Sequence, residues 1–190
     1  MNGLEAAAAV EQLGFDLASI AQASLKLKAV PGRLELIDTN KPFKVLVDYA
    51  PEPASMAALY SVLPSFKARR IIHVFGSAGG GRDQARRPIL GKFVAERSDV
   101  AIVTNEDPYD EPPEKIIDQI VSGTQQSQPR KAQVEKIVDR RQAIQRALSM
   151  AQPGDLIVVT GKACEQWIVG PHGTKTAWDD RRVIRELLEP

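Results

Sequence analysis

A glycine-rich segment followed by arginines is the feature of this sequence best suited to binding a charged ligand. Gly76–Gly81 holds four glycines after an apolar run, and Arg82, Arg86 and Arg87 follow it. Glycine lets a backbone approach a ligand and turn its amides toward an anion, and guanidinium groups pair with carboxylates and phosphates. The pattern favours an anion site over a flexible turn with a solvated basic face. A Walker A loop is excluded, because no Gly-Lys-Ser/Thr follows such a turn at the required spacing anywhere in the chain.

The segment Thr104–Tyr109 places two carboxylates and an amide directly after another apolar run. Asn105, Glu106 and Asp107 offer oxygens that could hold an ammonium group or a metal ion. The same residues, with the prolines that follow them, are equally typical of a turn that caps the next helix. The local sequence leaves both interpretations open.

A third candidate segment, Gly161–Gln166, follows the apolar run Leu156–Thr160. Glu165 could accept a hydrogen bond from an amine. Cys164 is a candidate nucleophile, but neither histidine of the chain is identifiable as its base. A lone cysteine is more often an inert small apolar residue, and without a second cysteine the chain can form no intrachain disulfide.

A fourth candidate is the segment Asp48–Pro53, whose first residue, Asp48, follows the apolar segment Phe43–Val47. An acidic residue at a strand end holds a ribose hydroxyl at dinucleotide sites, but it can equally cap the next helix. Arg33, beside the Pro31-Gly32 turn, is by itself an ordinary surface arginine.

All four segments follow predicted strands in a chain that alternates strands with helices. Apolar and β-branched runs predict strands at Leu34–Ile37, Phe43–Val47, Arg70–Phe75, Val100–Thr104, Lys136–Val138 and Leu156–Thr160. Helical spacing and capping residues predict helices at Gly3–Leu13, Asp16–Lys28, Pro53–Leu63, Pro88–Glu96, Pro113–Gly123, Asp139–Met150 and Asp179–Leu188. The first two are predicted to be separated at Gly14, and Asp16 and Asp139 are the predicted N-caps of their helices. This order predicts an α/β fold, a parallel sheet covered by helices. Ligands bind beyond the carboxyl ends of such strands, so we expect the four segments to meet there.

The composition is that of a globular chain with no sign of a nucleic-acid or membrane partner. The 190 residues are 43% hydrophobic and carry a formal net charge of +1. A nearly balanced charge gives no reason to expect nucleic acid, and the apolar runs are far shorter than a membrane span. Because the N-terminus also lacks the basic start of a signal peptide, we expect a cytoplasmic protein.

Six short motifs occur in the order in which one family carries them. They are Val30–Glu35, Val47–Ala50, Gly76–Pro88, Thr104–Pro108, Gly161–Gln166 and Trp178–Arg181. With them the chain resembles the Mur ligase family, and within it the UDP-N-acetylmuramyl-tripeptide synthetases. The resemblance implies that residues 1–38 end the central ATPase domain. It also implies that residues 39–190 form the Rossmann-like C-terminal domain, a mostly parallel sheet with helices on both faces that binds the amino acid. The UDP-sugar domain and the P-loop domain, its partners in that family, would lie outside the chain.

The resemblance implies an ATP-dependent ligase of peptidoglycan biosynthesis. In the family, ATP phosphorylates the carboxylate of UDP-N-acetylmuramoyl-dipeptide, and the amine of an amino acid then displaces the phosphate. Arg33 and Asp48 match positions that contact the ATP nucleotide. ATP and Mg²⁺ would act in the full-length enzyme, and we expect this chain alone to hold neither, to carry no catalytic residue and to be inactive.

Five residues match positions that bind the incoming amino acid: Arg82, Asp107, Tyr109, Gly161 and Glu165. In the family the arginine grips the amino acid's carboxylate, and the last two contact its distal end. Members that use meso-diaminopimelate carry Asp-Asn-Pro-Arg where this chain has Glu106–Tyr109. Gaining a carboxylate and losing an arginine suits a distal ammonium, so we expect L-lysine or another diamino acid.

Two other interpretations stay open. The chain could belong to another Mur-superfamily ligase, such as a cyanophycin or folylpolyglutamate synthetase, although the Gly161–Gln166 and Trp178–Arg181 motifs favour the tripeptide synthetases. It could also be a free-standing, non-enzymatic domain that binds an amino acid or a nucleotide, since it has no P-loop. Pro51 and Cys164 stand where the family has histidines.

Overall fold

The computed structural model describes residues 2–129 and 131–189. Its contacts divide the chain into two compact units, Met1–Val30 and Pro31–Pro190. The larger unit begins upstream of the boundary predicted after residue 38, because Glu35–Ile37 forms a strand of its sheet. The assignment of residues 1–38 to a central ATPase domain stays a prediction.

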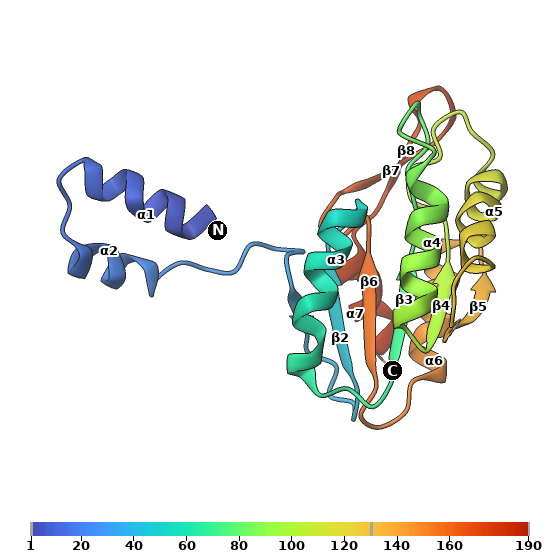
Figure 1. Cartoon of the computed structure of the whole chain (residues 1–190), viewed down its shortest axis with the longest axis horizontal. Helices are drawn as coiled ribbons and strands as arrows, with labels where there is room; N and C mark the ends of the chain where they lie inside the picture. The colour runs from blue at the N-terminus through green and yellow to red at the C-terminus, as the bar shows by residue number, and fades with distance from the viewer. Residues whose placement is uncertain (1, 130, 190) are drawn as a thin grey trace. The chain divides into compact units, whose positions relative to one another are not determined.

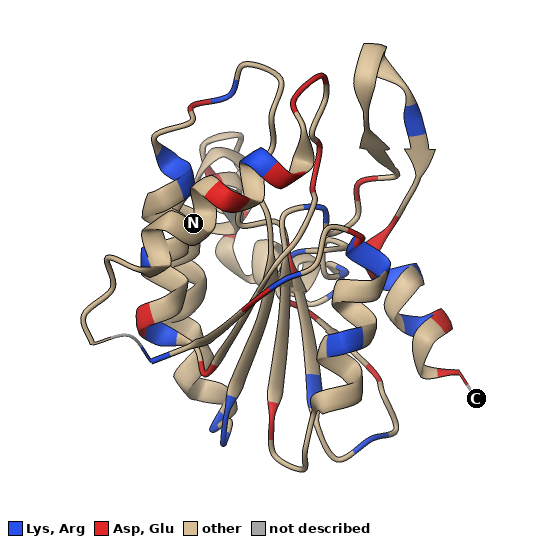
Figure 2. Ribbon diagram, turned by 90° about the vertical axis from the view of Figure 1, so that its right-hand side faces the viewer, with Lys and Arg blue, Asp and Glu red and all other residues tan. Residues whose placement is uncertain are grey.

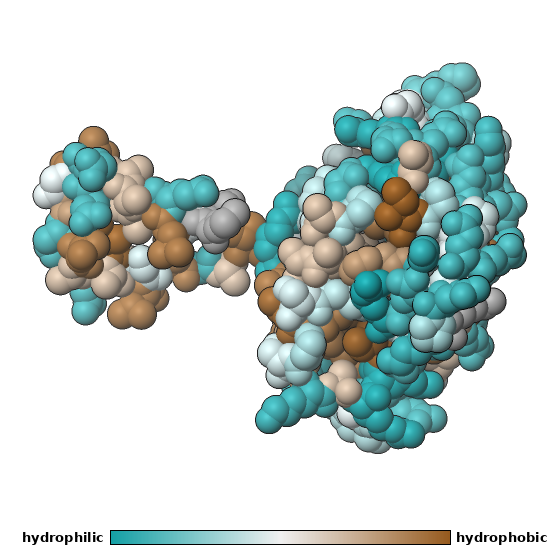
Figure 3. Space-filling view, viewed as in Figure 1, coloured by the Kyte–Doolittle hydropathy of each residue, from teal (hydrophilic) through white to brown (hydrophobic). Residues whose placement is uncertain are grey.

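The small unit contains two helices, α1 (Asn2–Gln12) and α2 (Leu17–Ser24). As predicted, they are separated at Gly14, whose φ is 94°. Asp16 is the predicted N-cap of α2, and its carboxylate accepts a hydrogen bond from the Ser19 amide at 2.9 Å. Apolar side chains cover much of the visible surface of this unit (Figure 3). Those exposed are Leu4, Val10, Leu13, Phe15, Leu17, Leu25, Leu27 and Val30.

The larger unit is built on a six-stranded sheet of order β1-β2-β6-β3-β4-β5. The strands are β1 (Glu35–Ile37), β2 (Lys44–Asp48), β3 (Ile71–Phe75), β4 (Val100–Val103), β5 (Gln133–Lys136) and β6 (Leu156–Thr160). β1 pairs antiparallel with β2, and the other neighbours pair in parallel. This confirms the predicted, mostly parallel sheet. Asp48 lies level with Thr160, and Phe75 with Val103, so the strands end at one edge.

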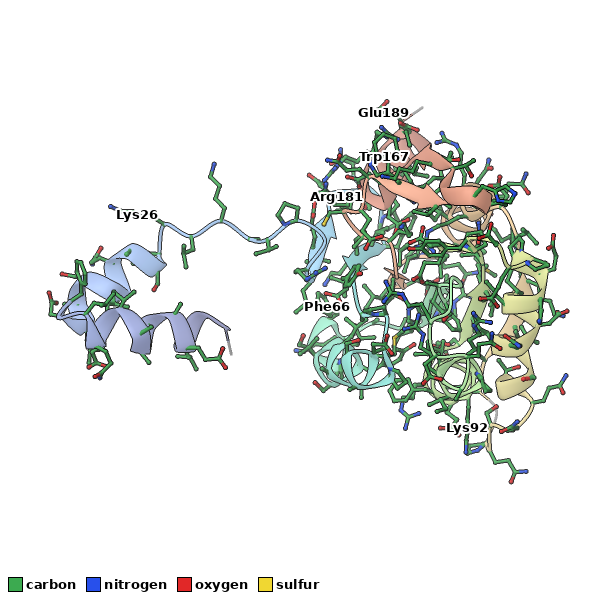
Figure 4. All side chains as sticks on the ribbon, turned by 90° about the horizontal axis from the view of Figure 1, so that it is seen from above. Lys26, Phe66, Lys92, Trp167, Arg181 and Glu189 are labelled. Carbon is green, nitrogen blue, oxygen red and sulfur yellow. The ribbon has the colours of Figure 1, made fainter. Side chains whose placement is uncertain are left out.

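Helices cover both faces of this sheet, as predicted (Figure 1). One face carries α3 (Pro53–Val62) with the 3₁₀ helix η1 (Leu63–Phe66), α4 (Arg86–Arg97) and α5 (Pro113–Thr124). The other carries α6 (Arg140–Met150) and α7 (Asp180–Leu188). Because alternate strand residues point to opposite faces, Val158 joins one core while Ile157 and Val159 join the other. Viewed from above, Phe66 and Lys92 mark the α3–α4 side, and Trp167 and Arg181 lie on the opposite side (Figure 4).

Three details differ from the prediction. α2 ends at Ser24, before the predicted end at Lys28. β5 begins at Gln133, upstream of the predicted start at Lys136. A hairpin of β7 (Trp167–Val169) and β8 (Lys175–Ala177), joined through the short helix η2 (Pro171–Gly173), was not predicted. Its strands are three residues each and mostly solvent-exposed, so they carry no alternating apolar pattern. Among the described residues, no helix is long and apolar enough to cross a membrane.

Candidate functional site

A cavity of about 560 Å³ opens where β2, β3, β4 and β6 end. Residues from all four predicted segments and from the β7–β8 hairpin line it: Tyr49, Pro51, Glu52, Ala78, Arg82, Arg86, Glu106, Asp107, Tyr109, Lys162, Cys164, Glu165, Gln166, Trp167, Val169 and Lys175. The structure therefore brings Arg82, Asp107, Tyr109 and Glu165 of the predicted amino-acid site to one cavity. Neither His73 nor His172 lines this cavity, so neither is placed to act as a base for Cys164.

A buried lysine joins two of the predicted ligand residues. Lys162 Nζ donates to both carboxylate oxygens of Asp107 at 2.8 Å and to Glu165 Oε2 at 2.5 Å. The Lys162 side chain is only 1% exposed. Asp107 also accepts a hydrogen bond from the Val169 amide at 2.7 Å, which ties the hairpin to the cavity wall. Asp107 is thus paired inside the protein, whereas the sequence suggested a carboxylate free for the ligand.

Glu106, which the local sequence offered as a ligand for an ammonium group but which the five-residue amino-acid site did not include, is the cavity residue with an unpaired carboxyl group. It is 5% exposed, and its buried Oε2 has no hydrogen-bond partner within residues 2–129 and 131–189. Burial raises the pKa of this carboxyl to about 7, although the nearby Arg140 opposes the shift. An ammonium group in the cavity would supply the missing donor. The sequence feature that points to Glu106 as a site residue is its position beside Asp107, just after a buried strand.

The three arginines after the glycine-rich segment have different surroundings. Arg87 is buried and pairs with Glu111 at 2.9 Å and 3.0 Å, and Arg86 pairs with Glu52. Arg82 lines the cavity, and in the described part of the chain its guanidinium forms no ion pair and no hydrogen bond. Arg82 is therefore the arginine left to bind an anion.

The glycines of the same segment serve packing against the Thr104–Tyr109 segment. A Cβ at Gly80 would lie 2.5 Å from the Tyr109 ring, and a Cβ at Gly76 would lie 2.6 Å from a backbone oxygen. Gly79 donates its amide to the Asp107 carbonyl at 2.7 Å. The glycine-rich segment and the Thr104–Tyr109 segment therefore pack against each other and form one wall of the cavity.

Gly161 lies just behind the cavity and does not line it. Its φ is 106°, and a Cβ there would collide with the Glu106 carboxylate. The residue makes room for Glu106, which is a packing role beside the predicted contact to the amino acid.

The two residues predicted to contact ATP lie next to the cavity and do not line it. Asp48 accepts hydrogen bonds from the amides of Leu34 at 2.8 Å and Ala50 at 3.0 Å. It does not cap α3, whose N-cap is Glu52. The Arg33 guanidinium lies 4.4 Å from the centre of the Tyr49 ring. Tyr49 lines the cavity, where burial, together with the nearby Glu165 carboxylate, raises the Tyr49 pKa to about 12.

Comparison with known proteins places this geometry in a family. The model of the Mur ligase, glutamate ligase domain, matches residues 32–163. The chain belongs to the Mur ligase family.

Similar proteins within that family include ligases named for 2,6-diaminopimelate. The UDP-N-acetylmuramoyl-L-alanyl-D-glutamate–2,6-diaminopimelate ligase of Syntrophomonas wolfei is 37% identical over 98% of this chain, which spans 37% of that relative. A solved structure of a ligase of the same name is 32% identical with a TM-score of 0.71, over 96% of this chain and 36% of that one. The Thermotoga maritima MurF ligase, solved in complex with ADP, is 17% identical with a TM-score of 0.58, over 95% of this chain and 35% of that one. At that identity the similarity shows the fold alone.

Proposed function

We propose that this chain is the amino-acid-binding part of an ATP-dependent ligase of peptidoglycan biosynthesis. The ligase would add the third amino acid to UDP-N-acetylmuramoyl-dipeptide. The observation that carries the proposal is the cavity, in which an unpaired guanidinium, Arg82, and an unpaired carboxyl group, Glu106, are both available to a ligand. An amino acid carries the complementary groups, a carboxylate and an ammonium. The relatives named 2,6-diaminopimelate ligases support a diamino acid as the substrate.

The chemistry assigned to this chain is binding and orientation. A ligase of this class needs the amine held against an activated carboxylate, and holding reactants in place removes much of the entropic barrier. Arg82 would bind the α-carboxylate, and Glu106 and Glu165 would accept hydrogen bonds from the amine at the other end. Tyr109 would close the wall beside them, over Gly80.

ATP and Mg²⁺ would be held mostly by the rest of the ligase, outside this chain. Arg33 is exposed and can reach a nucleotide, but each Asp48 oxygen already accepts a backbone amide. Among the described residues, no group of three or more histidine, cysteine, aspartate or glutamate side chains could hold a metal ion. The purified chain should therefore show no ATP turnover above a mock preparation, and a measured turnover would contradict this assignment.

For the substrate itself, we propose L-lysine or a similar diamino acid over meso-diaminopimelate. A distal ammonium would meet Glu106 and Glu165. A distal carboxylate would meet Glu106, Asp107 and Glu165, with Lys162 already paired and Tyr109 in place of an arginine. A penalty of a few kcal/mol corresponds to roughly a hundredfold discrimination.

A competition assay tests this choice. The complete ligase that carries this chain is offered L-lysine and meso-diaminopimelate at equal concentration, and the product should contain mainly lysine. Asp107→Asn combined with Tyr109→Arg should lose that preference. A product containing mainly diaminopimelate would contradict the charge argument.

We also propose that residues 1–38 end a central ATPase domain. The apolar side chains that α1 and α2 expose support this, because such surfaces usually pack against a partner. In the isolated chain, amides of these helices should exchange with solvent faster than those of Leu156–Thr160. Equal protection in a monomeric sample would argue against a missing partner.

A further inference from the structure

An ion pair between the first residues of α6 and α7 lies outside the cavity. Arg140 Nε and Nη2 donate to the two carboxylate oxygens of Asp180, both at 2.8 Å. The side chains are 1% and 0% exposed. Neither residue lines the cavity. The pair therefore does not face the amino-acid cavity.

Arg140 also bridges two strands that are not neighbours. Its Nη2 donates to the Thr160 carbonyl at 2.7 Å, and its Nη1 donates to the Asn105 carbonyl at 3.2 Å. These carbonyls lie at the ends of β6 and β4, with β3 between the two strands. Thr160 stands two residues before Lys162, and Asn105 directly precedes Glu106. A planar guanidinium can reach three separate acceptors with a fixed geometry, which a lysine ammonium on a flexible stem does not.

Asp180 fixes the segment after β6 at a strained residue. Its Oδ2 accepts from the Ala163 amide at 2.9 Å, and its own amide donates to the Ala163 carbonyl at 3.2 Å. Ala163 has a φ of 46°, a left-handed conformation that residues with a Cβ rarely adopt. The Trp178 indole donates to Asp180 Oδ1 at 2.8 Å and holds the carboxylate in place. These contacts give the Trp178–Arg181 motif a structural purpose.

We propose that Arg140 and Asp180 are positioning residues for the amino-acid site, which set the spacing between the Glu106–Asp107 wall and the Lys162–Glu165 wall. They act on the ligand through those four residues and do not touch it. The ligand's identity rests on the proposed function, whereas the spacing of the walls does not. Lys162 reports that spacing directly, since its ammonium bonds across the gap to Asp107 and also to Glu165.

The test compares two ion pairs at opposite ends of the sheet. Arg140→Lys and Asp180→Asn alter the positioning pair. Arg70→Lys is the matched control, because Arg70 pairs with the buried Asp155 at 2.7 Å and donates to the Met150 carbonyl at 2.9 Å. All variants are made in the 190-residue chain, and their unfolding midpoints are measured first. Two readouts follow: the ¹H–¹⁵N signal of the Lys162 ammonium, and the dissociation constant for L-lysine.

Arg140→Lys and Asp180→Asn should move or broaden the Lys162 ammonium signal. They should also weaken L-lysine binding by about ten- to a hundredfold, the usual cost of displacing a binding group by an ångström. At a comparable loss of stability, Arg70→Lys should leave the Lys162 ammonium signal in place. It should change the dissociation constant for L-lysine by no more than about twofold. If Arg140→Lys does not fold, Asp180→Asn carries the comparison, since an asparagine oxygen still accepts from the Ala163 amide.

An unchanged ammonium signal and unchanged binding in both variants would overturn the proposal and leave the pair a purely structural one. If the unsubstituted chain binds no amino acid, the proposed function of the isolated chain fails. The ammonium signal still decides the positioning role in that case, because it needs no ligand.

Discussion

Each end of the central sheet buries a carboxyl group, and the two groups differ in their hydrogen bonds. At the amino ends of β3 and β6, Asp155 accepts hydrogen bonds from Arg70 and from the Gln152 amide through one oxygen, Oδ2. Its other oxygen is buried without a partner in the described part of the chain. At the carboxyl ends, Glu106 also has a buried unpartnered oxygen, but no hydrogen bond compensates its charge. Charged residues occupy both ends of the sheet, and the strands between them largely lack them (Figure 2).

This difference separates a structural end from a binding end. Asp155 keeps its counter-charge inside the protein, so its burial is offset locally. Glu106 lies in the cavity that the unpaired Arg82 also lines. Arg140 offsets the burial of Glu106 only in part, and a ligand donor would supply the missing hydrogen bond. Glu106 and Arg82, which have no ion-pair partner in the described structure, therefore mark the carboxyl end as the place where stability is given up for binding.

The largest change in the free energy of unfolding is expected when one buried carboxylate is removed at either end of the sheet. Asp180→Ala removes the hydrogen-bonded counter-charge of the buried Arg140 and should lower the free energy of unfolding by about 3–5 kcal/mol. Asp155→Ala should cost less, about 1–3 kcal/mol, because Arg70 is 29% exposed and can turn to water. Guanidinium-induced unfolding of both variants measures the difference. Equal losses would mean that the two pairs are energetically alike.

The second effect is a pH dependence at Glu106. Its ordinary pKa of 4.5 is raised to about 7, so the folded state holds a proton that the unfolded state releases between those values. Stability from this group is therefore present at low pH and is lost as the pH rises toward 7. Glu106→Gln removes the loss and should stabilise the chain at pH 8 by about 2–3 kcal/mol relative to its effect at pH 4.

The measurement is urea-induced unfolding of Glu106→Gln and of the unsubstituted chain from pH 4 to pH 8. Glu114→Gln, at an exposed site in α5, is the control for the same change of side chain outside the cavity. A difference that does not change with pH for Glu106→Gln would show that this carboxyl is ionised freely in the folded state.

A third comparison uses one glycine from each end of the sheet. Gly161→Ala must accommodate a φ of 106° and a collision with the Glu106 carboxylate, so it should cost about 1–3 kcal/mol and weaken amino-acid binding. Gly154→Ala has a φ of 85°, but its Cβ would lie an ordinary 3.4 Å from Arg69. It should cost about 1 kcal/mol and leave binding unchanged. Thermal unfolding and L-lysine titration measure both, and equal effects on binding would remove the distinction between the ends.

The smallest effect on stability is expected for Arg82→Ala, below about 0.5 kcal/mol, because this guanidinium has no partner in the described structure. In the complete ligase it should raise the KM for the amino acid or lower kcat, with little change in the KM for ATP. An unpaired ligand carboxylate in a closed site typically costs about 2–5 kcal/mol. If instead the KM for ATP rises sharply while amino-acid kinetics stay the same, Arg82 contacts a phosphate.

The sequence determined the helices and strands, and it also determined the edge of the sheet at which the ligand-binding groups lie. Asp16 and Asp139 were identifiable as helix caps, and both accept the expected amide hydrogen bond in the structure. The apolar runs predicted the parallel strands, because side chains buried on both faces leave a continuous pattern that can be read locally. From strand direction alone, the four polar segments were expected at one edge, and the cavity lies there.

Only the tertiary structure decided which charges are paired. Asp107 was predicted to face a ligand, but Lys162 binds it from another strand, and Glu106 beside it was left unpartnered. Arg140 and Asp180 gave no local signal of their pairing. Such pairs depend on strand order, register and the approach of loops, none of which is encoded in the spacing of neighbouring residues. A carboxylate's neighbours along the chain predict that it lies at the site, whereas its neighbours in space decide whether it can bind a ligand.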